Sequence, residues 1–152
     1  MGGICARIAP ESILINVQAP EKEAVIHRLV AALARSGAVS DPALLEKDVL
    51  EREELVSTCV GLGCAVPHAH SAAAATTMIA AASLNPPADL DAPDGEPVSL
   101  VFLIAGPEDS AGLHLRILSK LARLLHDGEF RDELRNAEDP EAFLEILRGR
   151  DG

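Results

Sequence analysis

The chain has 152 residues, of which 48% are hydrophobic and 24% are charged, and Asp and Glu outnumber Lys and Arg by 24 to 13. These proportions are typical of soluble globular proteins, and we expect residues 1–152 to form a single domain. The net charge of −11 disfavours nucleic acid and anionic membrane surfaces as partners, because both attract basic side chains. Aromatic residues make up 2% of the chain, which also disfavours stacking on bases.

The cysteines and the apolar stretches indicate the cellular compartment of the protein. Cys5, Cys59 and Cys64 form an odd set, and the sequence shows no charged segment followed by an apolar leader. Both features favour a reducing cytoplasm. The apolar stretch after Ser71 is interrupted at Asn85, so it is too short to span a bilayer. We therefore expect a cytoplasmic protein without direct membrane insertion.

In the first third of the chain, the pattern predicts one strand and two helices. The strand covers about Ile13–Gln18, and the first helix runs over Glu21–Ser36 with apolar residues along one side. Asp41 and Pro42 form a cap followed by a first-turn proline, which predicts the start of a second helix. This helix is expected to end near Glu54.

Two further strands are predicted in the middle of the chain, over Thr76–Leu84 and Val98–Ala105. The second is rich in β-branched and aromatic residues and is almost continuously apolar, which suits a sheet covered on both faces. The turn-rich stretch Asn85–Pro97 is predicted to be the loop between them.

Two helices are predicted at the end of the chain. Residues Leu113–His126 place their apolar side chains on one stripe, with Gly128 as the expected stop. Asp139 and Pro140 repeat the cap and proline signal and begin a terminal helix, for which Gly149 is the expected end. Strands mixed with helices predict an α/β fold.

The distribution of charge singles out one part of the sequence. No Asp, Glu, Lys or Arg occurs from Leu55 to Ala88, a stretch called here the neutral window, and His68 and His70 lie within it. A buried part of a sheet would explain the neutral window, because it needs no charge. A site that must receive negative charge would explain it as well. The two explanations are compatible, and both stay open.

The segment that ends at His70 has the composition of a reactive loop. Two glycines upstream allow another surface to approach closely. Pro67 fixes its own backbone and restricts its neighbour, which favours an extended, loop-like presentation of His68. A neutral imidazole is a good nucleophile and can form a covalent intermediate. Phosphoryl transfer would therefore suit His68.

Several short motifs occur in an order that matches one known family. They are Arg52-Glu53, Ser57-Thr58, Gly61, Gly63, Ala65-Val66-Pro67-His68-Ala69, the pair His114-Leu115 after Val101–Ala105, and Phe130–Leu134 before the terminal helix. Together they resemble the enzyme IIA domain of the bacterial phosphoenolpyruvate-dependent phosphotransferase system, of the fructose, mannitol and nitrogen-regulatory type. The resemblance extends from about residue 8 to about residue 147.

This resemblance implies an α/β fold with a central mixed β-sheet flanked by helices. It implies that His68 accepts a phosphoryl group on Nε2 from the phosphohistidine of an HPr-type carrier and passes it to a IIB component in sugar uptake. Arg52 and His114 match the family's supporting arginine and histidine, and no cofactor or metal is expected. The alternative is a freestanding nitrogen-type IIA that binds transporters or kinases according to its phosphorylation state. The absence of a fused IIB or IIC segment from the 152 residues favours this alternative.

The chemistry of the three residues agrees with these roles. By analogy with other phosphorylated side chains, a phosphorylated imidazole carries a charge of about −1.5 to −2 and needs donors nearby. Arg52 can supply a planar fork of N–H groups, and His114 can donate from a ring nitrogen. The helix that opens near Leu113 adds backbone N–H groups and the positive end of its dipole.

Each of these residues also has a purely structural explanation. Arg52 lies among glutamates and could be a solvated charge paired to its neighbours. His114 could be a half-buried residue of its helix. His27 and His126 lie on predicted helices without supporting motifs, and we expect both to be structural.

Two positions depart from the family pattern. Cys59 stands where a glycine is expected, and His70 stands where a basic or small residue is usual, so His70 could help bind phosphate or tune the choice of partner. On an extended segment, Cys64, His68 and His70 would share one face and could bind zinc. Against zinc, Pro67 interrupts regular strand geometry and the spacing matches no strong zinc signature.

Overall fold

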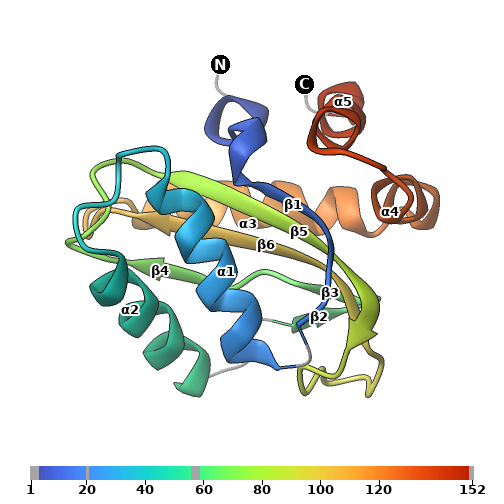
Figure 1. The fold of residues 1–152 in the computed structure, drawn as a ribbon, viewed down its shortest axis with the longest axis horizontal. Helices are drawn as coiled ribbons and strands as arrows, with labels where there is room; N and C mark the ends of the chain where they lie inside the picture. The colour runs from blue at the N-terminus through green and yellow to red at the C-terminus, as the bar shows by residue number, and fades with distance from the viewer. Residues whose placement is uncertain (1–3, 20, 56–58, 151–152) are drawn as a thin grey trace.

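A six-stranded β-sheet runs through the centre of the protein in a computed structural model that describes residues 4–19, 21–55 and 59–150 (Figure 1). Its strands are β1 (Ile13–Val17), β2 (Cys59–Gly61), β3 (Cys64–Ala65), β4 (His68–His70), β5 (Met78–Ala88) and β6 (Val98–Gly106). The α-helices are α1 (Lys22–Ala34), α2 (Pro42–Leu55), α3 (Ala111–Leu125), α4 (Gly128–Arg135) and α5 (Pro140–Arg150). Two short 3-10 helices, η1 (Ile4–Arg7) and η2 (Pro10–Ser12), precede β1.

The sheet is mixed, with the strand order β1-β5-β6-β3-β2 and with β4 also paired to β6. β1 is parallel to β5, β5 is antiparallel to β6, and β6 is parallel to both β3 and β4. β2 is antiparallel to β3. This architecture confirms the predicted α/β fold with a central mixed sheet flanked by helices. All nine residues of β6 are buried, as its continuous apolar run predicts.

Different helices cover the two faces of the sheet. α1 and α2 lie on the face toward the viewer in Figure 1, whereas α3, α4, α5 and η1 pack on the opposite face. Successive residues of β5 alternate between the two cores, with Ala80 and Ala82 in the first and Ile79 and Ala81 in the second. Because successive side chains of a strand point to opposite faces, a strand that is apolar throughout requires helices on both sides.

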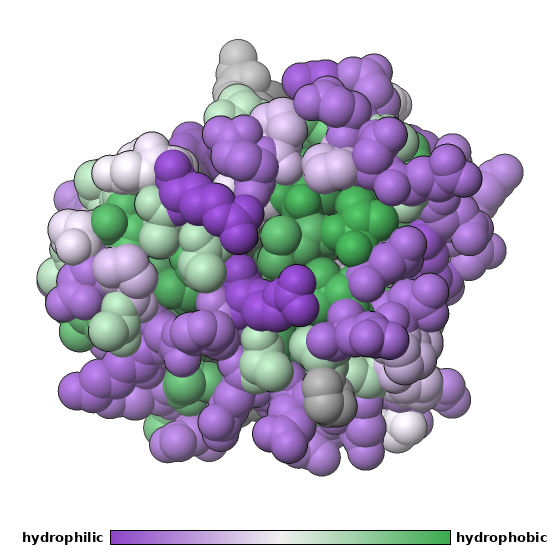
Figure 2. All heavy atoms as spheres, in the orientation of Figure 1, coloured by the Kyte–Doolittle hydropathy of each residue, from purple (hydrophilic) through white to green (hydrophobic). Residues whose placement is uncertain are grey.

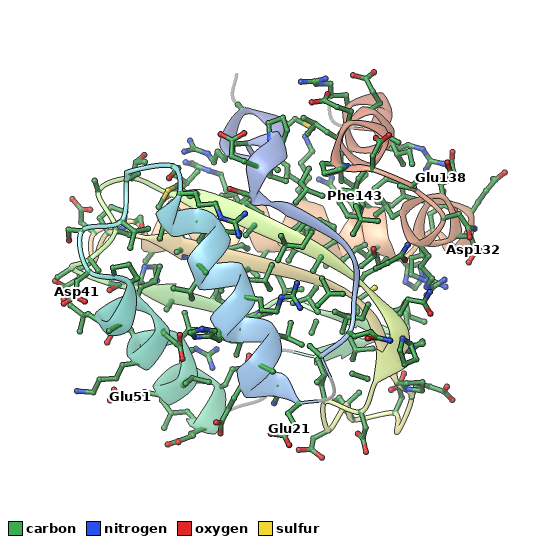
Figure 3. The ribbon with its side chains drawn as sticks, in the orientation of Figure 1. Glu21, Asp41, Glu51, Asp132, Glu138 and Phe143 are labelled. Carbon is green, nitrogen blue, oxygen red and sulfur yellow. The ribbon has the colours of Figure 1, made fainter. Side chains whose placement is uncertain are left out.

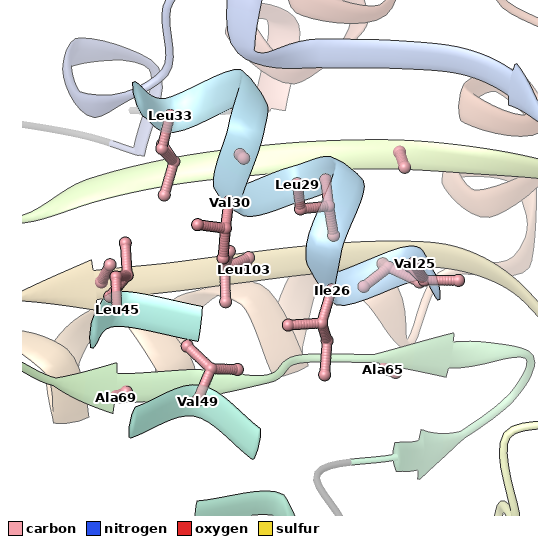
Figure 4. Packing of buried hydrophobic residues seen from close by; sticks show 14 of the residues in the cluster. Val25, Ile26, Leu29, Val30, Leu33, Leu45, Val49, Ala65, Ala69 and Leu103 are labelled. Carbon is pink, nitrogen blue, oxygen red and sulfur yellow. The ribbon is translucent and has the colours of Figure 1, made fainter. Parts of the chain in front are cut away.

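The two cores differ in composition. Side chains of α1 and α2, among them Leu29 and Val49, meet Leu103 of β6 in the first core, which is aliphatic (Figure 4). The second core holds the three phenylalanines, which are fully buried: Phe102, Phe130 and Phe143. Burial of each such ring stabilises the fold by about 1.5–3 kcal/mol. The few aromatic residues of the chain therefore belong to the core beneath α3, α4 and α5.

Charged side chains surround these cores. The labelled acidic residues in Figure 3 are exposed and lie around the rim, with Phe143 inward of them: Glu21, Asp41, Glu51, Asp132 and Glu138. On the face shown in Figure 2, hydrophilic residues crowd the outline and hydrophobic residues form patches between them. Within the described ranges, none of the helices has the length and apolar character needed to cross a membrane.

Two glycines do not end helices as the sequence predicts. α3 ends at Leu125, and Gly128 is the first residue of α4. Asp127 caps α4, because its side chain accepts hydrogen bonds from the backbone N–H groups of residues 129 and 130. Gly149 lies inside α5, which continues to Arg150. A glycine costs a helix only about 1 kcal/mol relative to alanine, which packing of the remaining residues overrides.

The predicted loop over residues 85–97 begins later than expected. β5 continues to Ala88, which pairs with Val98 after an irregular register that follows Ser83. Pro86 and Pro87 lie in this irregular and exposed part of the strand, where a missing backbone N–H is tolerated.

Candidate functional site

Strand β4 displays two histidines at one end of the sheet. His68 lies opposite Ile104 of β6 and His70 lies opposite Gly106. Because side chains alternate along a strand, both rings emerge on the same side. Ala69, between them, is buried in the first core near α2 (Figure 4). The predicted loop-like presentation is thus a short strand, anchored to the core by its middle residue.

The ring of His68 is held in one tautomer. Its Nδ1 lies 3.0 Å from the carbonyl oxygen of Val66. A carbonyl oxygen only accepts, so Nδ1 carries the proton and donates it. The lone pair of the neutral ring is then on Nε2, which lies 3.5 Å from Nη2 of Arg52. The nucleophilic nitrogen is therefore next to a guanidinium group.

The electrostatics of His68 favour its neutral form. Burial is the largest influence and lowers the pKa of His68 below its usual value, while the bond to the Val66 carbonyl acts in the opposite direction. The charge of Arg52 lowers this pKa further, and that of Glu53 raises it. Since the net shift is downward, the imidazole is neutral at pH 7, which is the form that attacks an electrophile.

Arg52 comes from the last turn of α2 and is half-buried. The next residue, Glu53, is buried, with 8% of its surface exposed. The Glu53 carboxylate lies 3.1 Å from Nζ of Lys22, at the start of α1. This ion pair ties the end of α2 to α1 and so helps to hold Arg52 beside His68.

His114 lies in the first turn of α3 and is buried, with 2% of its surface exposed. The structural alternative for His114, a half-buried helix residue, had assumed only partial burial. Neither of its ring nitrogens has a hydrogen-bond partner within the described part of the chain. Burial, followed by the charges of His70, His68 and Arg7, lowers the pKa of His114 to about 4. The ring is therefore neutral at pH 7 and carries one N–H group that has no acceptor among the described residues.

His70 covers the ring of His114. The two ring centroids lie 4.3 Å apart, and the rings are tilted by 26° in a stacked arrangement. Nδ1 of His70 also lies 3.3 Å from Oγ of Ser110, the residue before α3. The structure thus brings His70 into the site as a neighbour of His114.

A surface hollow of about 370 Å³ opens beside His68 and His70. Its lining comes from the end of α2 and from β4: Asp48, Glu51, Arg52, Leu55, His68, Ala69 and His70. Asp48 accepts a hydrogen bond of 2.6 Å from Oγ of Ser71. The neutral window therefore has carboxylates beside it in space, although it has none in the sequence, because α2 folds against β4.

A metal centre gains no support from the structure. Across residues 4–19, 21–55 and 59–150, no group of three His, Cys, Asp or Glu side chains is arranged to hold a metal ion. Cys64 is buried, and burial raises the pKa of its thiol to about 11. Cys64, His68 and His70, the three side chains considered for zinc, therefore do not form such a group in the structure.

Three features of the site were not found in the sequence. The Val66 carbonyl orients His68, and Gly106 makes room for His114, because a Cβ there would come under 3.0 Å from the imidazole. Arg7 donates a hydrogen bond of 3.5 Å to the Thr77 carbonyl oxygen, and its charge lowers the pKa of His114. Gly106 ends an apolar strand, and a glycine in a strand often marks such a close approach. The motif residues Ser57 and Thr58 and the side chain of Cys59 lie outside the described residues.

Similarity to known proteins identifies the family. Residues 7–149 match the family described as "Phosphoenolpyruvate-dependent sugar phosphotransferase system, EIIA 2". The chain belongs to this EIIA family. Over 144 residues it is 35% identical to the fructose-specific EIIABC component of the phosphotransferase system of Bacillus subtilis. The match covers 95% of this chain but only 23% of that protein.

Members of the EIIA family with a regulatory name are similar as well. The chain is 35% identical over 140 residues to a nitrogen regulatory protein of Bradyrhizobium diazoefficiens, covering 92% of this chain and 91% of that protein. The crystal structure of the nitrogen regulatory protein IIA-Ntr from Neisseria meningitidis has a TM-score of 0.88 and 30% identity, and the match covers 95% of this chain and 98% of that chain. Relatives of this EIIA chain therefore include both sugar-specific and regulatory proteins.

Proposed function

We propose that this chain is a phosphoryl carrier of the phosphotransferase system, working as a single domain in the cytoplasm and without a cofactor. His68 accepts a phosphoryl group on Nε2 from the phosphohistidine of an HPr-type carrier and passes it to a IIB component in sugar uptake. The observation that carries the proposal is the state of the His68 ring. Its Nδ1 proton is engaged by the Val66 carbonyl, and its Nε2 lone pair lies 3.5 Å from Arg52.

The transfer needs one bond exchange. The lone pair of His68 Nε2 forms the new bond to phosphorus, and the donor nitrogen takes back the electron pair of the bond that breaks. The proton on Nδ1 of His68 stays in place, because it is hydrogen-bonded to the backbone. Catalysis then consists of positioning and of stabilising charge on the phosphoryl oxygens.

Arg52 and His114 are the two side chains proposed to stabilise that charge. The guanidinium of Arg52 offers a planar set of donors that fits phosphoryl oxygens. His114 is neutral and buried, and its N–H group has no acceptor within the described residues. Leaving such a group unbonded costs about 1–3 kcal/mol. A phosphoryl oxygen that accepts this hydrogen bond would remove the cost.

The carboxylates that line the hollow support the proposal that the phosphoryl group stays on His68 only transiently. Asp48 and Glu51 line the same hollow as His68, and a phosphorylated imidazole would carry a charge of about −1.5 to −2 beside them. Like charges at short range repel. This repulsion raises the free energy of the phosphorylated state and so favours onward transfer to an acceptor.

A second candidate function is a regulator that binds transporters or kinases according to its phosphorylation state. The likeness to the Neisseria nitrogen regulatory protein, with a TM-score of 0.88, supports it. Both candidates require phosphorylation of His68. They differ in whether the phosphoryl group moves on to a IIB component.

The test of the shared step is labelling of the purified chain with phosphoenolpyruvate, enzyme I and an HPr-type carrier. We expect an acid-labile phosphate on the wild-type protein and none on His68→Ala. His126→Ala is the matched control, because His126 is exposed at the end of α3, and it should be labelled like the wild type. Absence of label on the wild type, or equal labelling of His68→Ala, would overturn the proposal.

A second measurement separates the two candidate functions. The labelled protein is purified and mixed with IIB components that are encoded in the same genome. Loss of label from this chain with its appearance on a IIB component supports sugar relay. Retention of the label against every IIB component supports the regulatory role.

A further inference from the structure

Among the residues that the structure describes, none forms a hydrogen bond with the ring of His114. Both of its nitrogens lack a partner within the described residues, although the side chain is buried. An imidazole without such bonds can rotate about its side-chain torsions unless packing prevents it. Its orientation therefore depends on the surfaces that touch the ring.

Two surfaces confine that ring. One is the backbone at Gly106, where a Cβ would come under 3.0 Å from Nε2 of His114. The other is the ring of His70, stacked on His114 with 4.3 Å between the centroids. Gly106 and His70 are register partners on β6 and β4, so one pair of strands provides both.

His70 is itself fixed in place. Its backbone belongs to β4, and its Nδ1 lies 3.3 Å from Oγ of Ser110. The Ser110 hydroxyl in turn donates to the Pro107 carbonyl oxygen at 2.5 Å. Because that hydroxyl proton is used, the Ser110 oxygen is left to accept from Nδ1 of His70. The loop before α3 therefore holds the ring that covers His114.

We propose that His70 is a positioning residue that fixes the orientation of the His114 ring through their stack, so that His114 can serve phosphoryl transfer at His68. This inference rests on the proposed function and adds a residue to its site. His70 acts through aromatic contact with His114, and its own ring nitrogens take no part in the reaction. The stack is the feature that must be preserved for transfer at the wild-type rate.

Three variants of His70 separate the stack from the hydrogen bond. His70→Phe keeps an aromatic ring over His114 but cannot bond to Ser110. His70→Gln keeps a polar group for Ser110 but offers no ring, and His70→Ala removes both. We expect phosphoryl transfer to slow by about tenfold in the Ala and Gln variants, since small misplacement of a catalytic group has effects of this size or larger. The Phe variant should remain close to the wild-type rate.

A double-mutant cycle tests whether His70 acts through His114. If it does, His70→Ala should lower the rate of phosphoryl transfer when it is made in the wild-type protein, but it should not lower the rate further when it is made in His114→Ala. An additional loss in the double variant would contradict the proposal, as would transfer at the wild-type rate in His70→Ala. Rescue by Gln instead of Phe would also overturn it, because the hydrogen bond would then be the active feature.

A readout without phosphorylation distinguishes a failure of this inference from a failure of the proposed function. In NMR spectra of the unphosphorylated protein, the ring protons of His114 should give one sharp set of signals in the wild type and in His70→Phe. In His70→Ala they should broaden or split as the ring samples several orientations. Sharp, single signals in all three proteins would refute the positioning role, even if labelling of His68 succeeds.

Discussion

Nε2 of His68 and Nη2 of Arg52 lie 3.5 Å apart where β4 meets the end of α2. Two separate features, one of the backbone and one of the core, create this relationship. The Val66 carbonyl turns the His68 ring so that Nε2 is available, and the core anchors Ala69 and Val49 of the two elements. The guanidinium is thus in place before any phosphoryl group arrives, and it costs no reorganisation during transfer.

Substitution of Arg52 should slow phosphoryl transfer without unfolding the protein. We expect Arg52→Gln to lower the transfer rate by about 10²-fold, the size of effect seen when one charge-stabilising donor is removed. Arg52→Lys should recover part of the rate, because it restores the charge but not the planar fork. Rates from rapid-quench labelling and the thermal midpoint Tm provide the measurement. Arg28→Gln, on the exposed surface of α1, is the control and should leave both unchanged.

Gly106 should not tolerate a side chain. In Gly106→Ala the new Cβ would collide with His114, with Oγ1 of Thr77 at 2.6 Å and with Oγ of Ser110 at 2.8 Å. Overpacking of this kind costs about 1–3 kcal/mol, so the urea midpoint should fall and transfer should slow.

The matched control for that substitution is another glycine nearby. A Cβ on Gly112, in the first turn of α3, would meet nothing within 4 Å. Gly112→Ala should therefore raise the free energy of unfolding by about 0.5–1 kcal/mol, because alanine favours the helix. An unchanged urea midpoint in Gly106→Ala would show that the packing around His114 is looser than described.

His114 should make the protein less stable in mild acid. Its pKa is lowered from 6.5 to about 4 in the folded protein, so between these values the unfolded chain binds the proton more readily. Its contribution to stability is full above pH 6.5 and is lost as the pH falls toward 4. The pKa of His68 is also lowered, so His68 likewise loses its contribution to stability as the pH falls.

Urea unfolding at several pH values measures this dependence. Carboxylates also titrate in the range, so the comparison is with His114→Phe, which lacks the titrating ring and keeps an aromatic side chain. The loss of stability toward pH 4 should be smaller in this variant than in the wild type. Parallel curves for the two proteins would mean that His114 has an ordinary pKa.

The ion pair between Lys22 and Glu53 should contribute more than one on the surface. Lys22→Met leaves a buried carboxylate without the ammonium that lies 3.1 Å away, which we expect to cost about 1–3 kcal/mol. Lys47→Met is the control, because its pair with Glu51 is exposed and 3.8 Å long, and the change should stay within about 0.5 kcal/mol. Chemical denaturation of both variants measures the difference.

Local sequence signals were sufficient for most of the fold. The apolar run of β6 and the cap before α2 depend on neighbouring residues, and both were predicted near their observed positions. The roles predicted for Gly128 and Gly149 as helix stops were wrong, because Asp127 caps α4 at Gly128 and α5 continues through Gly149. A glycine alone does not show whether a helix stops before it or continues through it.

The candidate site could be predicted only in part, because some of its contacts join residues that are far apart in the sequence. The motifs around His68 and His114 are local, but the stack of His70 on His114 depends on strand register and on the path of α3. The carboxylate of Asp48 reaches the neutral window only because α2 packs on β4. Contacts between residues far apart in the sequence carry no signal in a single chain.

Phosphorylation of His68 at Nε2 is tested most directly by NMR of the labelled protein, which locates the phosphoryl group. With nitrogen-15 in the histidine rings, coupling between phosphorus and a ring nitrogen identifies the bonded atom. We expect coupling to Nε2 of His68, with Nδ1 still hydrogen-bonded to the Val66 carbonyl oxygen. Coupling to Nδ1 of His68, or to a nitrogen of His70 or His114, would contradict it.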